Sequence, residues 1–170
     1  LIEGSISFPW IFLSRSSEII GKVLVDKKSP FLRSVIINRG SRDGIELGMA
    51  VLDKSYLIGK VVEVSFTTSR VLLLSDLNSK VPVDIMPNNI QSILSGTGSD
   101  EGIIQYTRQQ ELIEKDAIVF TSGAGGLFKS GIPIGKIDVD PSNDRVIVSF
   151  FSDFSQLRYK KIISFKEETE

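Results

Sequence analysis

The sequence predicts an all-β protein with two similar small domains. From residue 22 onward, short runs rich in Val, Ile and Leu recur about every ten residues, with Gly, Pro, Asn and Asp between them. That spacing is typical of β-sandwiches and β-barrels. No segment keeps apolar residues at i, i+3, i+4 and i+7 over several turns, which argues against a helix-rich fold.

The elements follow from the pattern in chain order. Residues 1–20 are expected to form a lead-in, a short N-terminal helix or an arm, because serines break the apolar run 10–13. The segment 57–64 alternates in the way of a half-buried strand, and 71–74 is apolar on both faces and is expected to be central. A single helical turn is expected at 108–114. The expected strands are 22–26, 34–38, 50–53, 57–64, 69–75, 81–85, 90–95, 102–106, 117–121, 132–138, 145–151 and 161–165.

One pattern occurs twice along the chain. Both copies contain Ile-Gly-Lys, and both close on Ser-Asp, at Ser75 and Ser152. The matching segments are 48–51 and 116–119, 58–60 and 134–136, and 70–73 and 145–148. Two copies of one strand–turn–strand unit predict two similar small β-domains.

Composition excludes several classes of function. The 170 residues suffice for one ordinary domain or two small ones, and such a chain buries roughly 70% of its unfolded surface. There is no His and no Cys, which removes His-dependent and Cys-dependent catalysis and ordinary zinc sites. A net charge of −1 argues against a nucleic-acid binder that neutralises many phosphates. No run reaches the ~20 apolar residues of a membrane span. Because the chain begins with Leu1, we expect further residues upstream in the whole protein.

The most conspicuous motif is the Gly-rich segment 121–133. It matches neither the P-loop spacing nor Gly-x-Gly-x-x-Gly, and no clear helix follows it to bind an anion. It also lacks the Gly-x-Ser-x-Gly of a nucleophile elbow. We interpret it as a tight loop between two strands, with Phe128 packed inward as an anchor.

Weaker alternatives stay open. No Lys has a Ser three residues before it, so a Ser–Lys dyad would have to be assembled across the fold. The acidic segment 138–144 loosely suggests a calcium loop but lacks the EF-hand register, and turn formation explains it better. Basic residues around Phe31, including Lys28 and Arg33, leave an oligonucleotide-binding barrel as one alternative. A hydrolase on a trypsin-like β-barrel is the other.

Four stretches, taken together, resemble one family, the rod-shape-determining protein MreC of bacteria. They are VIINRGSRDGIELGMAV at 35–51, LIGKVVEV at 57–64, SRVLLLSDLNSKVPV at 69–83 and TSGAGGLFKSGIPIG at 121–135. Each alone is a weak hairpin signal, and their order and spacing over 22–137 carry the resemblance. The chain departs from the family at Lys129-Ser130, where a Pro near Phe128 is usual, and before Asp116, where a Gly is common. These departures concern local turn geometry.

The resemblance implies a fold and a division of the chain. Two small β-barrel domains are expected, one of them similar to a chymotrypsin-type barrel without catalytic residues. Residues 1–20 would be the lead-in from an upstream coiled coil, 21–107 the first barrel and 108–170 the second. An interleaved arrangement is the alternative, in which the terminal strands complete the first barrel and the second is an insertion.

The resemblance also implies a function without catalysis, cofactor or metal. The family is expected to act as a scaffold of the cell-elongation machinery, binding the class B penicillin-binding protein and working with RodA, MreD and MreB, with no nucleic acid involved. Self-association, as a homodimer of the full-length protein, is expected as well. The location implied is the periplasmic side of the inner membrane, with an N-terminal transmembrane helix upstream. Our candidate protein-contact residues are Leu127, Phe128 and Lys129 in the Gly-rich loop.

Overall fold

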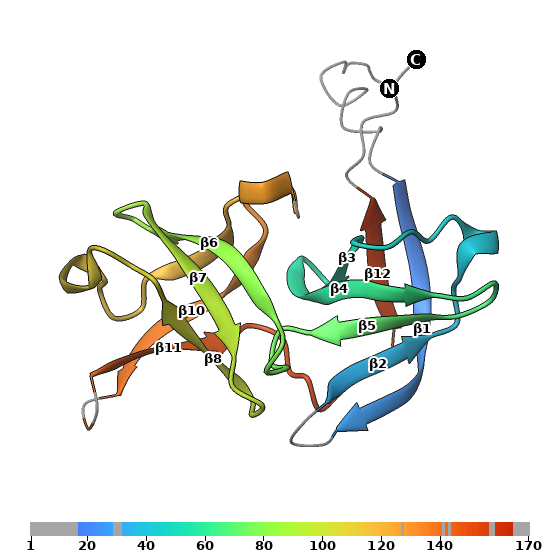
Figure 1. Cartoon of the computed structure of the whole chain (residues 1–170), viewed down its shortest axis with the longest axis horizontal. Coiled ribbons are helices and arrows are strands. Elements are labelled where there is room, and N and C mark those ends of the chain that lie inside the picture. The colour runs from blue at the N-terminus through green and yellow to red at the C-terminus, as the bar shows by residue number, and fades with distance from the viewer. Residues whose placement is uncertain are drawn as a thin grey trace, which may run out of the picture.

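The computed structural model describes residues 17–28, 32–126, 128–140, 142, 144–156 and 159–164. Within them the chain is almost entirely strand and turn, which confirms the predicted all-β class (Figure 1). The strands are β1 (Ser17–Lys28), β2 (Arg33–Ile37), β3 (Ala50–Asp53), β4 (Tyr56–Val64), β5 (Ser69–Leu73), β6 (Lys80–Met86), β7 (Ile90–Gly96), β8 (Glu101–Gln105), β9 (Ile118–Thr121), β10 (Pro133–Asp140), β11 (Arg145–Phe150) and β12 (Tyr159–Ser164). Short 3-10 turns are η2 (Ser41–Asp43), η3 (Gln110–Leu112) and η4 (Ala124–Gly126), and η3 lies within the helical turn predicted at 108–114.

The strands close into two barrels that lie side by side (Figure 1). The first has the order β1-β12-β3-β4-β5-β2, and the second has the order β10-β11-β8-β7-β6-β9. All pairs are antiparallel. Among the described residues, no helix is long and apolar enough to cross a membrane.

This pairing corrects the sequential division of the chain into 21–107 and 108–170. β6, β7 and β8 belong to the second barrel, and β12 returns to the first, where it lies between β1 and β3. The second barrel is therefore inserted between β5 and β12 of the first. The lead-in also ends earlier than expected, because residues 17–20 are already part of β1 and pair with β12. Residues 1–16 of the expected helix or arm lie outside the described residues.

The predicted repeat reappears as equivalent backbone hydrogen bonds. The N–H of Leu74 donates to the carbonyl of Ile58 over 2.9 Å in the first barrel, and Phe151 donates to Ile134 over 3.0 Å in the second. Strands β3, β4 and β5 thus correspond to β9, β10 and β11. The strand that completes the first barrel is β12, and in the second β6 occupies the corresponding place, between β7 and β9. In sequence, the repeat therefore runs from β1 to β6 and from β7 to β12. The last strand of each repeat, β6 or β12, completes the barrel formed by the other repeat.

The glycine shared by the two copies is required by close strand packing. A Cβ added to Gly59 would lie 2.1 Å from the carbonyl oxygen of Leu72, and one added to Gly135 would lie 2.3 Å from that of Ser149. Both distances are far inside van der Waals contact. The Ile-Gly-Lys triplet is therefore a packing requirement of each barrel.

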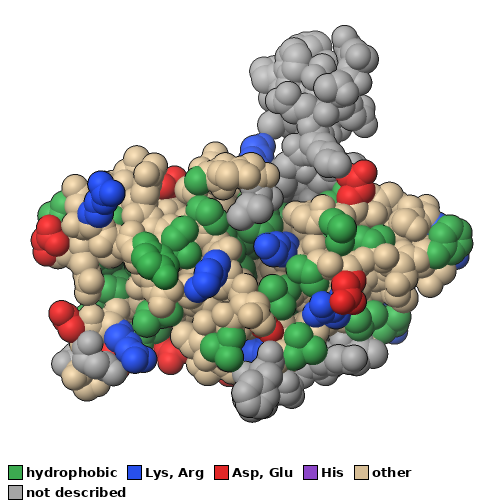
Figure 2. All heavy atoms as spheres, viewed as in Figure 1, with side chains coloured by type: hydrophobic (Ala, Val, Ile, Leu, Met, Phe, Trp, Pro, Cys, Tyr) green, Lys and Arg blue, Asp and Glu red, His purple; other side chains and the backbone are tan. Residues whose placement is uncertain are grey.

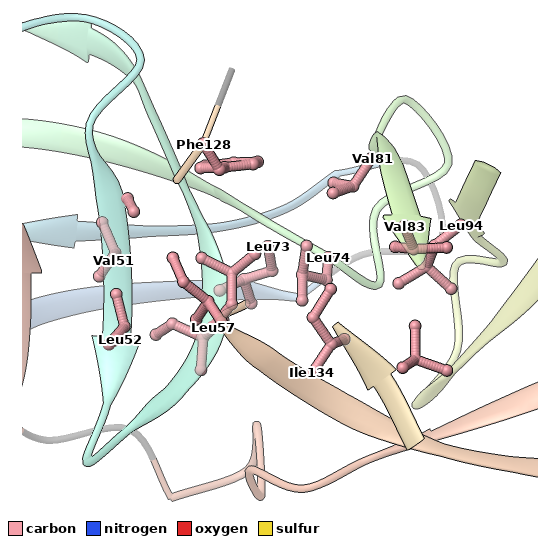
Figure 3. Packing of buried hydrophobic residues seen from close by; sticks show 14 of the residues in the cluster. Val51, Leu52, Leu57, Leu73, Leu74, Val81, Val83, Leu94, Phe128 and Ile134 are labelled. Atoms are coloured by element: carbon pink, nitrogen blue, oxygen red, sulfur yellow. The ribbon is translucent and has the colours of Figure 1, made fainter. Parts of the chain in front are cut away.

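The buried hydrophobic side chains form one cluster that extends across both barrels. Figure 3 shows it running from Leu57 of the first barrel past Leu73 and Ile134 to Val83 and Leu94 of the second. All five are 1% exposed or less. Full burial of such a side chain contributes about 1.5–3 kcal/mol. The two barrels are therefore expected to stabilise each other.

A buried carboxylate fixes the point where the chain passes between the barrels. Asp76, between β5 and β6, is 1% exposed. Its Oδ2 accepts a hydrogen bond from the N–H of Arg33 and its Oδ1 accepts one from that of Asn78, both 2.7 Å long. A Cβ on Gly96 of β7 would lie 2.0 Å from the Asp76 carbonyl oxygen. Asp76 is thus held against both barrels.

Candidate protein-binding surface

The Gly-rich loop between β9 and β10 is held by one threonine. The hydroxyl of Thr121 donates to the carbonyl of Lys129 over 2.6 Å and accepts from the N–H of Ile132 over 2.9 Å. The carbonyl of Thr121 also accepts from Gly131 over 2.8 Å. Gly131 has a φ of 87° and Gly123 one of 75°, a left-handed conformation that favours glycine. The loop is therefore a tight structural turn, as its composition predicted.

The three candidate contact residues have different positions. Phe128 is 7% exposed and belongs to the hydrophobic cluster, among whose labelled residues Figure 3 shows it. It acts as the anchor predicted for the loop. Lys129 is exposed beside it. Leu127 lies outside the described residues. The contact role of this loop stays a prediction. Its exposed described residues are those of η4, Ala124–Gly126, and the segment 129–131.

A groove of about 550 Å³ lies beside the start of this loop. It crosses the β6–β7 pair, and its other wall is the segment that follows β8. The lining residues are Pro82, Val83, Asn89, Ile90, Gln91, Ser92, Ile93, Tyr106, Arg108, Gln109, Ser122 and Ala124. Tyr106 is 78% exposed. Figure 2 shows hydrophobic side chains gathered on the face where β6 and β7 lie in Figure 1, with Lys and Arg side chains among them.

The sequence analysis did not predict this groove. Its walls come from three segments that are separated along the chain, and only the barrel brings them together. The available signal was an aromatic residue at the end of a predicted strand, Tyr106, followed by Arg108. Such a groove, with apolar and polar groups and one cation, suits contact with another protein.

A lysine and a serine do meet across strands β6 and β7. Lys80 Nζ donates to Ser95 Oγ over 3.2 Å, and Ser95 Oγ donates to Gln105 Oε1 over 2.8 Å. A catalytic lysine must accept the proton of the serine, which requires a buried, neutral amine. Lys80 is exposed, and the serine proton is directed to Gln105 instead. This contact is a structural cross-strand pair.

The basic residues near Phe31 and the acidic segment 138–144 were the other candidate sites, and their described residues have structural contacts. Arg33 pairs with Asp100 over 2.8 Å, while Phe31 lies outside the described residues. Asp140 accepts hydrogen bonds from the N–H and hydroxyl of Ser142, which makes the acidic segment a turn. No group of three or more His, Cys, Asp or Glu residues that could hold a metal ion occurs in the described part of the chain.

Comparison with known proteins identifies the family. The family model of the rod shape-determining protein MreC, barrel core, matches residues 23–164. The cell shape-determining protein MreC of Cereibacter sphaeroides is 34% identical over 147 residues, which are 86% of this chain and 49% of that protein. The MreC of Caulobacter vibrioides is 37% identical over 146 residues, 86% of this chain and 42% of that protein. The chain thus spans about half the length of these relatives.

Solved structures agree with the sequence relatives. The crystal structure of MreC from Pseudomonas aeruginosa has a TM-score of 0.79 and 28% identity, and the match covers 87% of this chain and 99% of that one. MreC of the Helicobacter pylori complex with a penicillin-binding protein (PBP2) has a TM-score of 0.68 at 17% identity, covering 89% of this chain and 99% of that one, which shows a shared fold. With the family matched over both barrels, this chain belongs to the MreC family of non-catalytic, cell shape-determining proteins.

Proposed function

We propose that this chain is the extracytoplasmic double-barrel part of a scaffold that binds a class B penicillin-binding protein and thereby organises side-wall peptidoglycan synthesis. Membership of the MreC family carries this proposal. The complex of MreC with PBP2 from Helicobacter pylori supports the choice of partner, because an MreC of the same fold there binds a penicillin-binding protein. One of the similar structures is described as the major periplasmic domain of MreC, which supports an extracytoplasmic location.

The topology suits a scaffold whose second barrel is presented to partners. Ser17 at the start of β1 pairs with Ser164 at the end of β12, so both described ends leave the first barrel together. The chain enters the second barrel between β5 and β6 and leaves it between β11 and β12, and this barrel lies to the side of those ends (Figure 1). Its groove is thus open to a partner while the first barrel continues toward the rest of the protein.

The wider assembly forms part of the same proposal. In the whole protein, an upstream transmembrane helix and coiled coil would hold the barrels at the membrane as a homodimer, near RodA and MreD and, through them, MreB. The Gly-rich loop with Lys129 borders the groove through Ser122 and Ala124, so both would face one partner. The contact requires no catalytic group in this chain.

Isothermal titration calorimetry tests the proposal. The chain is titrated with the extracytoplasmic part of the class B penicillin-binding protein of the same organism, with circular dichroism showing both proteins folded. Saturable binding is expected. Absence of binding between two folded proteins would overturn the assignment of this partner. Turnover of peptidoglycan or peptide by the pure chain would overturn the non-catalytic role.

A further inference from the structure

Strand β7 offers backbone groups on the side away from β6. The N–H of Gly96 donates to the carbonyl of Ser79 over 3.0 Å, so these residues form a hydrogen-bonded pair of the β6–β7 ladder. In an antiparallel ladder such pairs alternate with pairs whose backbone groups point away from the partner strand. Gln91, opposite Asp84, lies an odd number of residues from Gly96. Its N–H and C=O therefore point away from β6, toward the side on which β8 lies.

Strand β8 ends before it reaches Gln91. The β7–β8 ladder stops where Ile93 faces Gln105. The next residue, Tyr106, has a φ of 59°, a left-handed conformation that takes the chain out of the ladder. In the described part of the chain, no strand pairs with Gln91 on this side, and no backbone hydrogen bond from outside the ladders reaches it. Free strand edges of this kind accept an added strand from another chain.

The groove at this edge combines apolar surface with a positive charge. Pro82 and Ile93 are half-buried and, with the exposed ring of Tyr106, supply apolar surface. Arg108 is exposed and supplies a cation that suits a carboxylate. An extended segment with apolar side chains and one acidic residue fits both.

We propose that an extended segment of the penicillin-binding protein adds to the free edge of β7 at Gln91, with apolar side chains against Ile93 and Tyr106 and a carboxylate against Arg108. The inference rests on the proposed function for the identity of the partner. It adds the site, the extended conformation and the charge of the bound segment. Backbone pairing supplies affinity, and the side-chain contacts select the segment.

Paired variants test the proposal by calorimetry with the same penicillin-binding protein fragment. Tyr106→Asn keeps a residue that tolerates the left-handed backbone, and Arg108→Glu reverses the charge. Phe66→Asn and Arg42→Glu make the same changes on the first barrel, where Phe66 is 68% exposed and Arg42 is exposed. Each groove variant is expected to raise Kd about tenfold or more, as for central interface residues. The first-barrel variants are expected to leave Kd within about twofold.

Hydrogen exchange of the Gln91 amide supplies a readout that involves no substitution. The amide is expected to exchange quickly in the free chain and to be protected in the complex, because only the bound segment supplies its acceptor. Wild-type binding with no change in Kd for Tyr106→Asn and Arg108→Glu, or with an unprotected Gln91 amide, would overturn the β7 site and leave the scaffold role standing. Absence of wild-type binding would overturn both.

Discussion

Replacing Asp76 by alanine is expected to weaken the connection between the two barrels. The substitution removes both carboxylate oxygens, which accept hydrogen bonds from the backbone of Arg33 in β2 and of Asn78 before β6. The two N–H groups then lose a charged acceptor. The residue is 1% exposed, so little water is available to replace it. The predicted effect is a loss of global stability.

The structure sets the size of this loss. A hydrogen bond to a charged group contributes about 1.5–3 kcal/mol. The N–H of Arg33 belongs to a half-buried residue and should lose most of that amount, whereas Asn78 is exposed and water can partly replace its acceptor. We therefore expect Asp76→Ala to lower the free energy of unfolding by about 2–4 kcal/mol. Asp76→Asn keeps one acceptor oxygen and should lose about half as much.

Urea unfolding followed by circular dichroism measures the difference. In thermal unfolding of a chain of this size, a loss of 3 kcal/mol would lower Tm by about 6–12 °C. Asp100→Asn is the matched control, because it removes the other acid that contacts Arg33, over 2.8 Å, from a side chain that is 86% exposed. Because water solvates the Asp100 carboxylate, this pair is expected to contribute less than about 1 kcal/mol, although the Arg33 side chain is only 16% exposed. If Asp76→Ala costs no more than Asp100→Asn, the buried carboxylate does not hold the junction.

Three further predictions concern stability. Phe128→Ala should lower the free energy of unfolding, measured in urea, by about 3–5 kcal/mol. Lys129→Ala beside it should change that free energy by less than about 0.5 kcal/mol. Equal effects would contradict the anchor role of Phe128. Gly59→Ala and Gly135→Ala should each lower the free energy of unfolding by about 1–3 kcal/mol or more in the same assay, because the added methyl group meets the backbone of the neighbouring strand. An unchanged free energy at either position would contradict the close packing. Thr121→Val should lower the free energy of unfolding by about 2 kcal/mol and speed amide hydrogen exchange in the Gly-rich loop. Unchanged exchange would show that the Thr121 hydroxyl does not hold the loop.

The sequence by itself determined the local features of this protein. The all-β class follows from strand-length apolar runs between turn residues, because side-chain alternation and turn chemistry act over a few neighbours. The repeat was readable for the same reason, and the shared Ile-Gly-Lys now has a cause, since Gly59 and Gly135 both lie against the backbone of the next strand. The inward anchor at Phe128 was predictable from an aromatic inside a Gly-rich turn.

The tertiary structure alone decided which strands complete which barrel. β6 and β12 are both apolar strands, and nothing local distinguishes the barrel that each will join. The choice depends on non-local pairing and on a core shared across both barrels, which the chain order does not encode. The groove beside β7 has the same origin. Its free edge exists because β8 ends at Gln105 and Tyr106 turns away, and its walls meet only once the barrel has closed.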